Sequence, residues 1–194
     1  TSGTELWRSD GTEAGTEMIG DINPGSASSS PANLTVMGNH VYFAANNGTH
    51  GIELWRSDGT TAFLVRDIAT GTGSSQPSQF KAVGDTFYFQ ASQSGFGAEL
   101  WKTDGTEAGT VMVKDINPGA VSSSPTNLAA LDSILYFRAN SNGSGQELWR
   151  SDGTEAGTFL VTEIIPGPAS TFPNLITALG GGLYFQADNG DSGI

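Results

Sequence analysis

Carboxylates recur at fixed places in this sequence, and their spacing decides which chemistry they can support. Calcium loops place carboxylates at alternate positions, so that several oxygens surround one Ca²⁺ ion. The repeated phrase "SDGTEAGT" offers one aspartate and one glutamate, which is too few for such a loop. We therefore assign a turn role to the aspartates that precede glycine, predict no metal site or cofactor, and leave calcium as an open alternative. These aspartates are Asp10, Asp58, Asp104 and Asp152.

No group of residues in the sequence resembles a catalytic constellation. The chain has no cysteine, which excludes thiol catalysis, disulfides and cysteine-ligated zinc. Its two histidines, His40 and His50, stand close together in the sequence and have no partnered serine motif. The G-x-S-x-G, HExxH and P-loop motifs do not occur. The sequence therefore predicts a protein that is not an enzyme.

One phrase is repeated along the chain. The strands and turns that this repeat forms determine where the carboxylates and histidines lie. The segment "ELWRSDGTEAGT" at 5–16 recurs unchanged at 147–158, and variants begin at Glu53 and Glu99. A second phrase, "VYFAA" or "LYFQA", keeps step with the first, so that the unit is about 47 residues long, a period typical of propeller blades, solenoid coils or arrays. We predict that the aromatic residues of both phrases form the core of the units. They are Trp7, Trp55, Trp101, Trp149, Phe43, Phe89, Phe137 and Phe185.

Each unit contains four short apolar segments bounded by turn residues, which predicts four antiparallel strands in up-and-down order. In one unit the segments are Asn33–Met37, His40–Ala45, Glu53–Ser57 and Phe63–Ile68. The Asp-Gly pair after the third segment predicts a hairpin with a type I′ turn, which needs positive φ at both central positions. In the second copy Thr61 and Ala62 replace "EAGT", so that hairpin is expected to be shorter.

The faces of these strands predict how the sheets pack. In "VYFAA", Val41 and Phe43 point to one side, while Tyr42 and Ala44 point to the other, so both faces are apolar. Leu54 and Trp55 likewise lie on opposite sides of the third strand. Such strands must be covered on both faces, which stacked sheets achieve.

The predicted fold is therefore all-β: a β-propeller of about four blades, each a four-stranded antiparallel sheet. The partial units 1–22 and 165–194 would complete one blade by a two-plus-two strand closure between the two ends, with full units at 23–68, 69–116 and 117–164 in a single repeat domain, 1–194. The alternative is an open stacked-sheet or solenoid array. Whether the chain forms a closed ring of four blades, half of a larger ring or a window on a longer array stays open.

Composition limits the partners of the protein. The formal net charge is −12, from 8 basic and 20 acidic residues, so the surface repels phosphate backbones and nucleic acid is not expected as a partner. No stretch of 18 apolar residues occurs, so membrane insertion is not expected either. The sequence also shows no signal peptide, so an export address would lie upstream or have been removed.

The motifs "ELW", "DGT", "AGT", "DI-PG" and "LYF" resemble the ELWxxDGT repeat family over essentially the whole chain. That family comprises tandem repeats of large exported and surface-associated bacterial proteins, β-propeller-like in pattern and mostly without an assigned activity. The resemblance implies an extracellular or cell-surface location. It supports architecture more than chemistry.

The loops between second and third strands differ most between the copies, so they are the predicted binding face. The candidate ligand-binding residues on them are Asn47, His50, Phe96, Asn142 and Asp191. Phe96 would stack on a sugar ring, or alternatively lie against the neighbouring linker. We expect a non-catalytic extracellular repeat module, a structural, assembly or adhesion scaffold of a surface or fibre protein, which self-associates or stacks on neighbouring repeats. The alternative is a propeller that binds carbohydrate or a matrix polymer.

Overall fold

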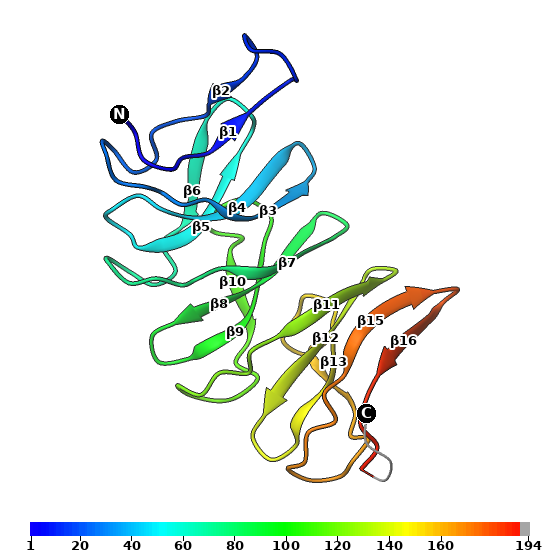
Figure 1. Cartoon of the computed structure of the whole chain (residues 1–194). Coiled ribbons are helices and arrows are strands. Elements are labelled where there is room, and N and C mark those ends of the chain that lie inside the picture. The colour runs from blue at the N-terminus through cyan, green and yellow to red at the C-terminus, as the bar shows by residue number, and fades with distance from the viewer. Residues whose placement is uncertain (191–194) are drawn as a thin grey trace.

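The computed structural model describes residues 1–190 and shows an all-β chain without helices, arranged as a row of small sheets (Figure 1). Three four-stranded antiparallel sheets form the middle of the row, and a two-stranded sheet lies at each end. Within each sheet every strand pairs with its neighbour in the sequence, which is the predicted up-and-down order. The all-β prediction and the four-stranded antiparallel sheets are confirmed.

The strands have the following bounds. The first end sheet consists of β1 (Trp7–Arg8) and β2 (Glu17–Met18). The three full sheets are β3 (Ala32–Met37), β4 (His40–Asn46), β5 (Ile52–Ser57) and β6 (Ala62–Arg66); β7 (Ser78–Val83), β8 (Thr86–Gln93), β9 (Gly97–Thr103) and β10 (Val111–Lys114); and β11 (Thr126–Leu131), β12 (Ile134–Ser141), β13 (Gly145–Ser151) and β14 (Phe159–Thr162). The last end sheet consists of β15 (Asn174–Leu179) and β16 (Gly182–Gln186).

The fourth strand is shorter than its apolar pattern suggests. Phe63–Ile68 was expected, but β6 ends at Arg66. The reason is that the backbone N–H of Ile68 donates to the carboxylate of Glu53 rather than to a strand. The side chain of Ile68 is nevertheless buried in the core, so its apolar character reports packing and not strand pairing.

The predicted type I′ turns at the Asp-Gly pairs are wrong. Gly59 has φ +90°, but the aspartate before it is not among the residues with positive φ, and the loop spans residues 58–61. The equivalent loop of the next sheet spans 104–110, so the second copy does have the shorter hairpin. The aspartate side chain closes these longer loops by accepting bonds from the following residues, and a two-residue turn is not needed.

The core lies between the sheets, and the first and second four-stranded sheets contribute both of their faces to it. Phe43 and Trp55 pack toward the first end sheet, where they meet Leu6 and Ile22. The opposite face of the same strands carries Tyr42 and Leu54, which pack against the second sheet. Tyr42 stacks on Phe87 with ring centroids 4.6 Å apart. The predicted two-sided burial is therefore confirmed.

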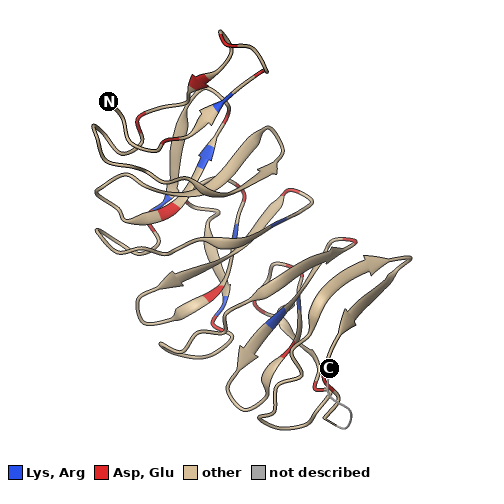
Figure 2. Ribbon diagram, viewed as in Figure 1, with Lys and Arg blue, Asp and Glu red and all other residues tan. Residues whose placement is uncertain are grey.

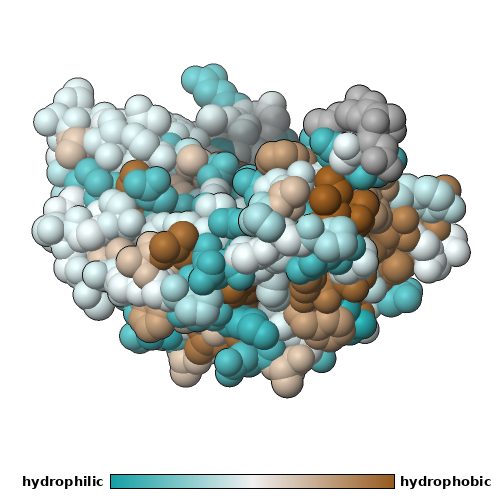
Figure 3. All heavy atoms as spheres, turned by 90° about the horizontal axis from the view of Figure 1, so that it is seen from below, coloured by the Kyte–Doolittle hydropathy of each residue, from teal (hydrophilic) through white to brown (hydrophobic). Residues whose placement is uncertain are grey.

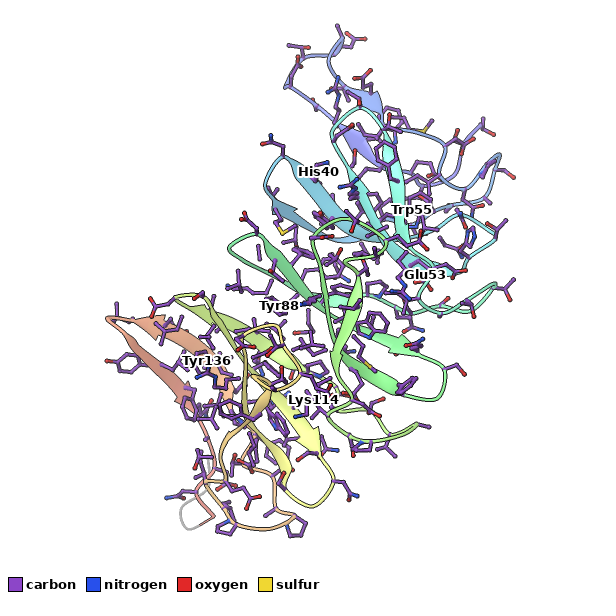
Figure 4. All side chains as sticks on the ribbon, turned by 180° about the vertical axis from the view of Figure 1, so that it is seen from behind. His40, Glu53, Trp55, Tyr88, Lys114 and Tyr136 are labelled. Carbon is purple, nitrogen blue, oxygen red and sulfur yellow. The ribbon has the colours of Figure 1, made fainter. Side chains whose placement is uncertain are left out.

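Polar contacts tie each sheet to the next at its inner and outer edges. The first strands β3, β7, β11 and β15 are neighbours along the row, and Asn33 Nδ2 donates to the carbonyl of Pro77 at 3.2 Å. At the outer edge Arg66 Nη1 donates to the carbonyl of Thr110 at 2.5 Å. Lys114 Nζ makes the equivalent bond, 2.8 Å, to the carbonyl of Thr158 (Figure 4). These repeated bonds fix how each sheet is set against its neighbour.

The predicted closure between the two ends is absent from residues 1–190. The strands β1 and β2 pair only with each other, as do β15 and β16, and the termini lie at opposite ends of the row (Figure 1). The physical reason lies in the contacts between sheets. Similar contacts orient each sheet against the one before it, and the curvature that results does not bring β16 back to β1. Residues 1–190 thus form an open row of stacked sheets that does not close into a ring.

Candidate functional site

The repeated glutamates hold the linkers between sheets. Glu53 is fully buried, and its Oε1 accepts the backbone N–H groups of Ala69 and Ser75 at 3.1 and 3.0 Å. Its Oε2 accepts the N–H of Ile68 at 3.1 Å and the hydroxyl of Ser75 at 2.6 Å. Figure 4 shows Glu53 among the loops on one side of the row, while His40 lies on the other side. The carboxylate therefore fixes the chain where it passes from one sheet to the next.

The same arrangement recurs in every unit. Glu5 bonds Ser29, Glu99 bonds Ser123 and Glu147 bonds Thr171. Burial raises the pKa of Glu53 and of Glu99, although the hydrogen bonds oppose this shift. Sequence reasoning missed the hydroxyl partner, yet a signal was present, because a serine or threonine stands two residues before the proline of each linker.

The aspartates before glycine serve their own turns. Asp58 Oδ1 accepts the N–H and the hydroxyl of Thr60 at 2.8 and 2.7 Å and the N–H of Thr61 at 2.9 Å. These bonds lower the pKa of Asp58 to about 2, and the bond from the Thr60 hydroxyl has the largest effect. Within residues 1–190 no three His, Cys, Asp or Glu side chains gather as they would around a metal ion.

The predicted ligand-binding residues do not form one site. Asn47 and His50 lie in one loop and bond each other, and Asn47 Oδ1 accepts the N–H groups of Thr49 and His50 at 3.1 and 2.9 Å. Phe96 lies in the β8–β9 loop with 37% of its surface exposed. Asp191 lies outside the described residues. Among the described candidates, Asn47 and His50 share one loop, whereas Phe96 and Asn142 lie in loops of two other sheets.

Asn142 lines a pocket at the end of the third sheet that carries the β12–β13 loop. This amide pocket has a volume of about 370 Å³ and is bounded by the linker after β10, the β12–β13 loop and the linker after β14. The polar side chains include Asn117, Asn140 and Asn142, and the apolar wall contains Pro118, Val121 and Pro168. The sequence did not point to Asn117 or Asn140, because they lie in different segments that only the fold brings together. Amides both donate and accept hydrogen bonds, so the pocket suits a neutral polyhydroxylated ligand.

The two ends of the row expose side chains that the internal sheets bury. Trp7 is 58% exposed, whereas Trp55, Trp101 and Trp149 are 8%, 3% and 7% exposed. At the other end Tyr184 is 61% exposed, whereas the equivalent Tyr42 and Tyr88 are 1% and 2% exposed. Leu175 and Leu179 are also exposed on β15, and Figure 3 shows hydrophobic residues gathered at the end of the molecule that carries this sheet.

Charge is spread thinly over the molecule. Acidic residues are dispersed along the row, and Figure 2 shows no continuous basic stripe on the ribbon. The ion pair within the described residues joins Arg8 to Glu17, and the guanidinium of Arg150 lies 5.1 Å from the ring centroid of Phe159. No helix in this part of the chain is long and apolar enough to cross a membrane.

These features define an all-β repeat chain of stacked four-stranded sheets. No family model and no curated protein matches it. Among solved structures, the chain is similar to that titled "Crystal structure of the computationally designed Ika8 protein: crystal packing No.1 in P63", with 16% identity, a TM-score of 0.46 and 85% of this chain covered. The chain covers 45% of that protein's chain and so spans less than half of its length.

Proposed function

We propose that this chain is a non-catalytic repeat module that acts as a structural or assembly scaffold by stacking on further repeats of the same kind. The exposed ends of the row carry this proposal. Trp7 occupies the position at which all three full sheets bury a tryptophan, and Tyr184 occupies the position at which the first two full sheets bury a tyrosine. An exposed apolar face of this kind is typical of an interaction surface.

The architecture supports a propeller-like arrangement of the extended assembly. The first strands of successive sheets lie side by side, as the inner strands of propeller blades do. Further repeats would continue the row and cover both ends. The resemblance to the ELWxxDGT repeats supports, as part of this proposal, an extracellular or surface protein of bacteria with an adhesive or fibre-forming role.

Sedimentation velocity over a range of protein concentrations tests this proposal. We expect species heavier than the 20.1 kDa chain, increasing with concentration. Trp7→Ser should weaken the association, because it removes the exposed aromatic ring of the first end sheet. Phe63→Ser is the matched control, since Phe63 is 44% exposed but lies on the outer strand β6. A single 20.1 kDa species at every concentration would contradict the proposal.

A second candidate function is carbohydrate binding, and the amide pocket favours it. Calorimetric titration of the protein with a panel of neutral oligosaccharides tests for carbohydrate binding. We expect saturable binding that Asn142→Ala removes. Gln93→Ala is the control, because Gln93 lines the corresponding, smaller pocket one sheet earlier, of about 260 Å³. Flat titrations across the panel would eliminate this function and leave the scaffold role untouched.

A further inference from the structure

Within residues 1–190, each end of the row carries half of a four-stranded sheet, and one strand of each half has no partner on the side where a full sheet would continue. The strand β16 pairs with β15 on one side, and β1 pairs with β2 on one side. In sequence and in place, β15 and β16 correspond to the first and second strands of a full sheet, and β1 and β2 correspond to the third and fourth. Unpaired strand edges of this kind are templates for pairing with another chain.

The three full sheets give the register in which a second strand meets a third. Phe43 lies opposite Trp55, Phe89 opposite Trp101 and Phe137 opposite Trp149. The neighbouring pair in each sheet has the same register. The tyrosine before the phenylalanine lies opposite the arginine or lysine after the tryptophan. These pairs are Tyr42 with Arg56, Tyr88 with Lys102 and Tyr136 with Arg150. The register is therefore a property of the repeat.

We propose that the open edge of β16 pairs with the open edge of β1 of a second copy of this chain, in the register of the internal sheets. This inference rests on the proposed scaffold function and specifies its contact. Phe185 then lies opposite Trp7, and Tyr184 lies opposite Arg8. The composite sheet has the strand order β15, β16, β1, β2 and repeats the topology of each full sheet.

Both halves are already shaped for this pairing. Glu5 accepts the N–H and hydroxyl of Ser29 at 3.0 and 2.5 Å, as the buried glutamates of the full sheets do with their linkers. At the other end the N–H of Asp188 donates to the carbonyl of Thr171 at 2.8 Å, the bond that Asn140 makes to Ser123 in the third sheet. Little ordering is therefore needed on association, which favours binding.

The pairing also covers both exposed rings. In the third sheet Trp149 packs in the cluster that contains Leu100 of the second sheet. The equivalent Trp7 would pack in the same way on the third sheet of the other copy. Tyr42 stacks on Phe87 of the next sheet, and Tyr184 would meet Val41, the residue at the position of Phe87 in the partner's first sheet.

The contact is heterologous, because each chain offers one edge of each kind. Copies joined in this way run head to tail, and they form a ring where the rotation closes or an open chain where it does not. The acidic chain needs no charged contact for this, since main-chain bonds and apolar rings supply the complementarity.

Cysteine crosslinking between mixed single variants tests the register. The chain has no cysteine of its own. Asp188 and Thr4 stand opposite each other in the proposed register, as Asn140 and Gln146 do in the third sheet. We expect a mixture of Asp188→Cys and Thr4→Cys chains to give a covalent dimer on oxidation, several-fold more than either variant alone or than Gln186→Cys mixed with Thr4→Cys.

Two further samples keep the test decisive. A chain carrying both Asn140→Cys and Gln146→Cys should form an internal disulfide, which shows that this register allows the bond. A chain carrying both Asp188→Cys and Thr4→Cys should form dimers or longer ladders, and an internal disulfide there would overturn the proposal. Equal crosslinking of the shifted pair, or none in either mixture, would also overturn it. If sedimentation still showed association, the scaffold function would stand without this contact.

Discussion

At the scale of single residues, the repeated carboxylates serve the fold. The polar positions were visible in the sequence, since Glu99 and Asp58 recur in every copy. The partner of Glu99 could not be predicted, because Ser123 lies 24 residues further along the chain and only the linker geometry brings it near. The partner of Asp58 could be predicted, because it lies within the same turn.

The buried glutamate should limit stability as pH rises. Burial raises the folded-state pKa of Glu99, so the stability linked to its proton is fully present below the ordinary value of 4.5 and is lost as pH rises through the raised value. Glu99→Gln should lack this loss. It should also lower the free energy of unfolding by about 1–3 kcal/mol, because an amide NH₂ cannot accept the bonds of Ser123 and Ile116.

Urea unfolding of both proteins at several pH values measures this effect. Glu107→Gln is the control, because Glu107 is exposed in the following turn and should change stability by less than about 0.5 kcal/mol. An unchanged pH profile in Glu99→Gln would contradict the assigned role of burial.

The turn aspartate should act in the opposite direction. The folded-state pKa of Asp58 lies at about 2 instead of 3.8, so its contribution is present above the ordinary value and is lost as pH falls toward about 2. We expect Asp58→Ala to be less stable than the parent near neutral pH, with the difference shrinking in acid. Thermal unfolding between neutral pH and pH about 2 measures this, and a difference that grows in acid would argue against the hydrogen-bonded turn.

At the scale of elements, the strands could be predicted well and the turns less well. Apolar segments bounded by turn residues placed β4 and β5 within one residue of their observed ends, because strands that are buried on both faces appear in the sequence as continuous apolar runs. The turn type failed because Asp-Gly was taken as a two-residue hairpin, whereas the aspartate side chain closes a longer loop. Side-chain closure is invisible to a rule based on backbone angles alone.

The turn glycines should differ in how much substitution they tolerate. A Cβ on Gly105, which has φ +93°, would lie 2.5 Å from the hydroxyl of Tyr42, a buried residue of the preceding sheet. Gly119 has a similar φ of +91°, but a Cβ there meets nothing within 4 Å. We expect Gly119→Ala to cost about 1–2 kcal/mol from the backbone alone, and Gly105→Ala to cost more. Urea unfolding measures both variants. Equal losses in the free energy of unfolding would show that the Tyr42 hydroxyl moves away from the added Cβ without cost.

At the scale of the whole molecule, the sequence predicted stacked sheets and not their final arrangement. The two-sided apolar strands require stacking, and the structure has it. Closure depends on the angle between successive sheets, which is set by contacts such as Arg66 with Thr110. No local pattern reports that angle, so the match between the two end units predicted a closure that residues 1–190 do not form.

The proposed scaffold requires further copies that extend the open row at its ends. Electron microscopy of the chain, at a concentration at which association is expected, shows whether they do. We expect curved chains or rings that are larger than one row of sheets, and we expect the Trp7→Ser variant to show single rows. Fields that contain only isolated single-chain particles would contradict it.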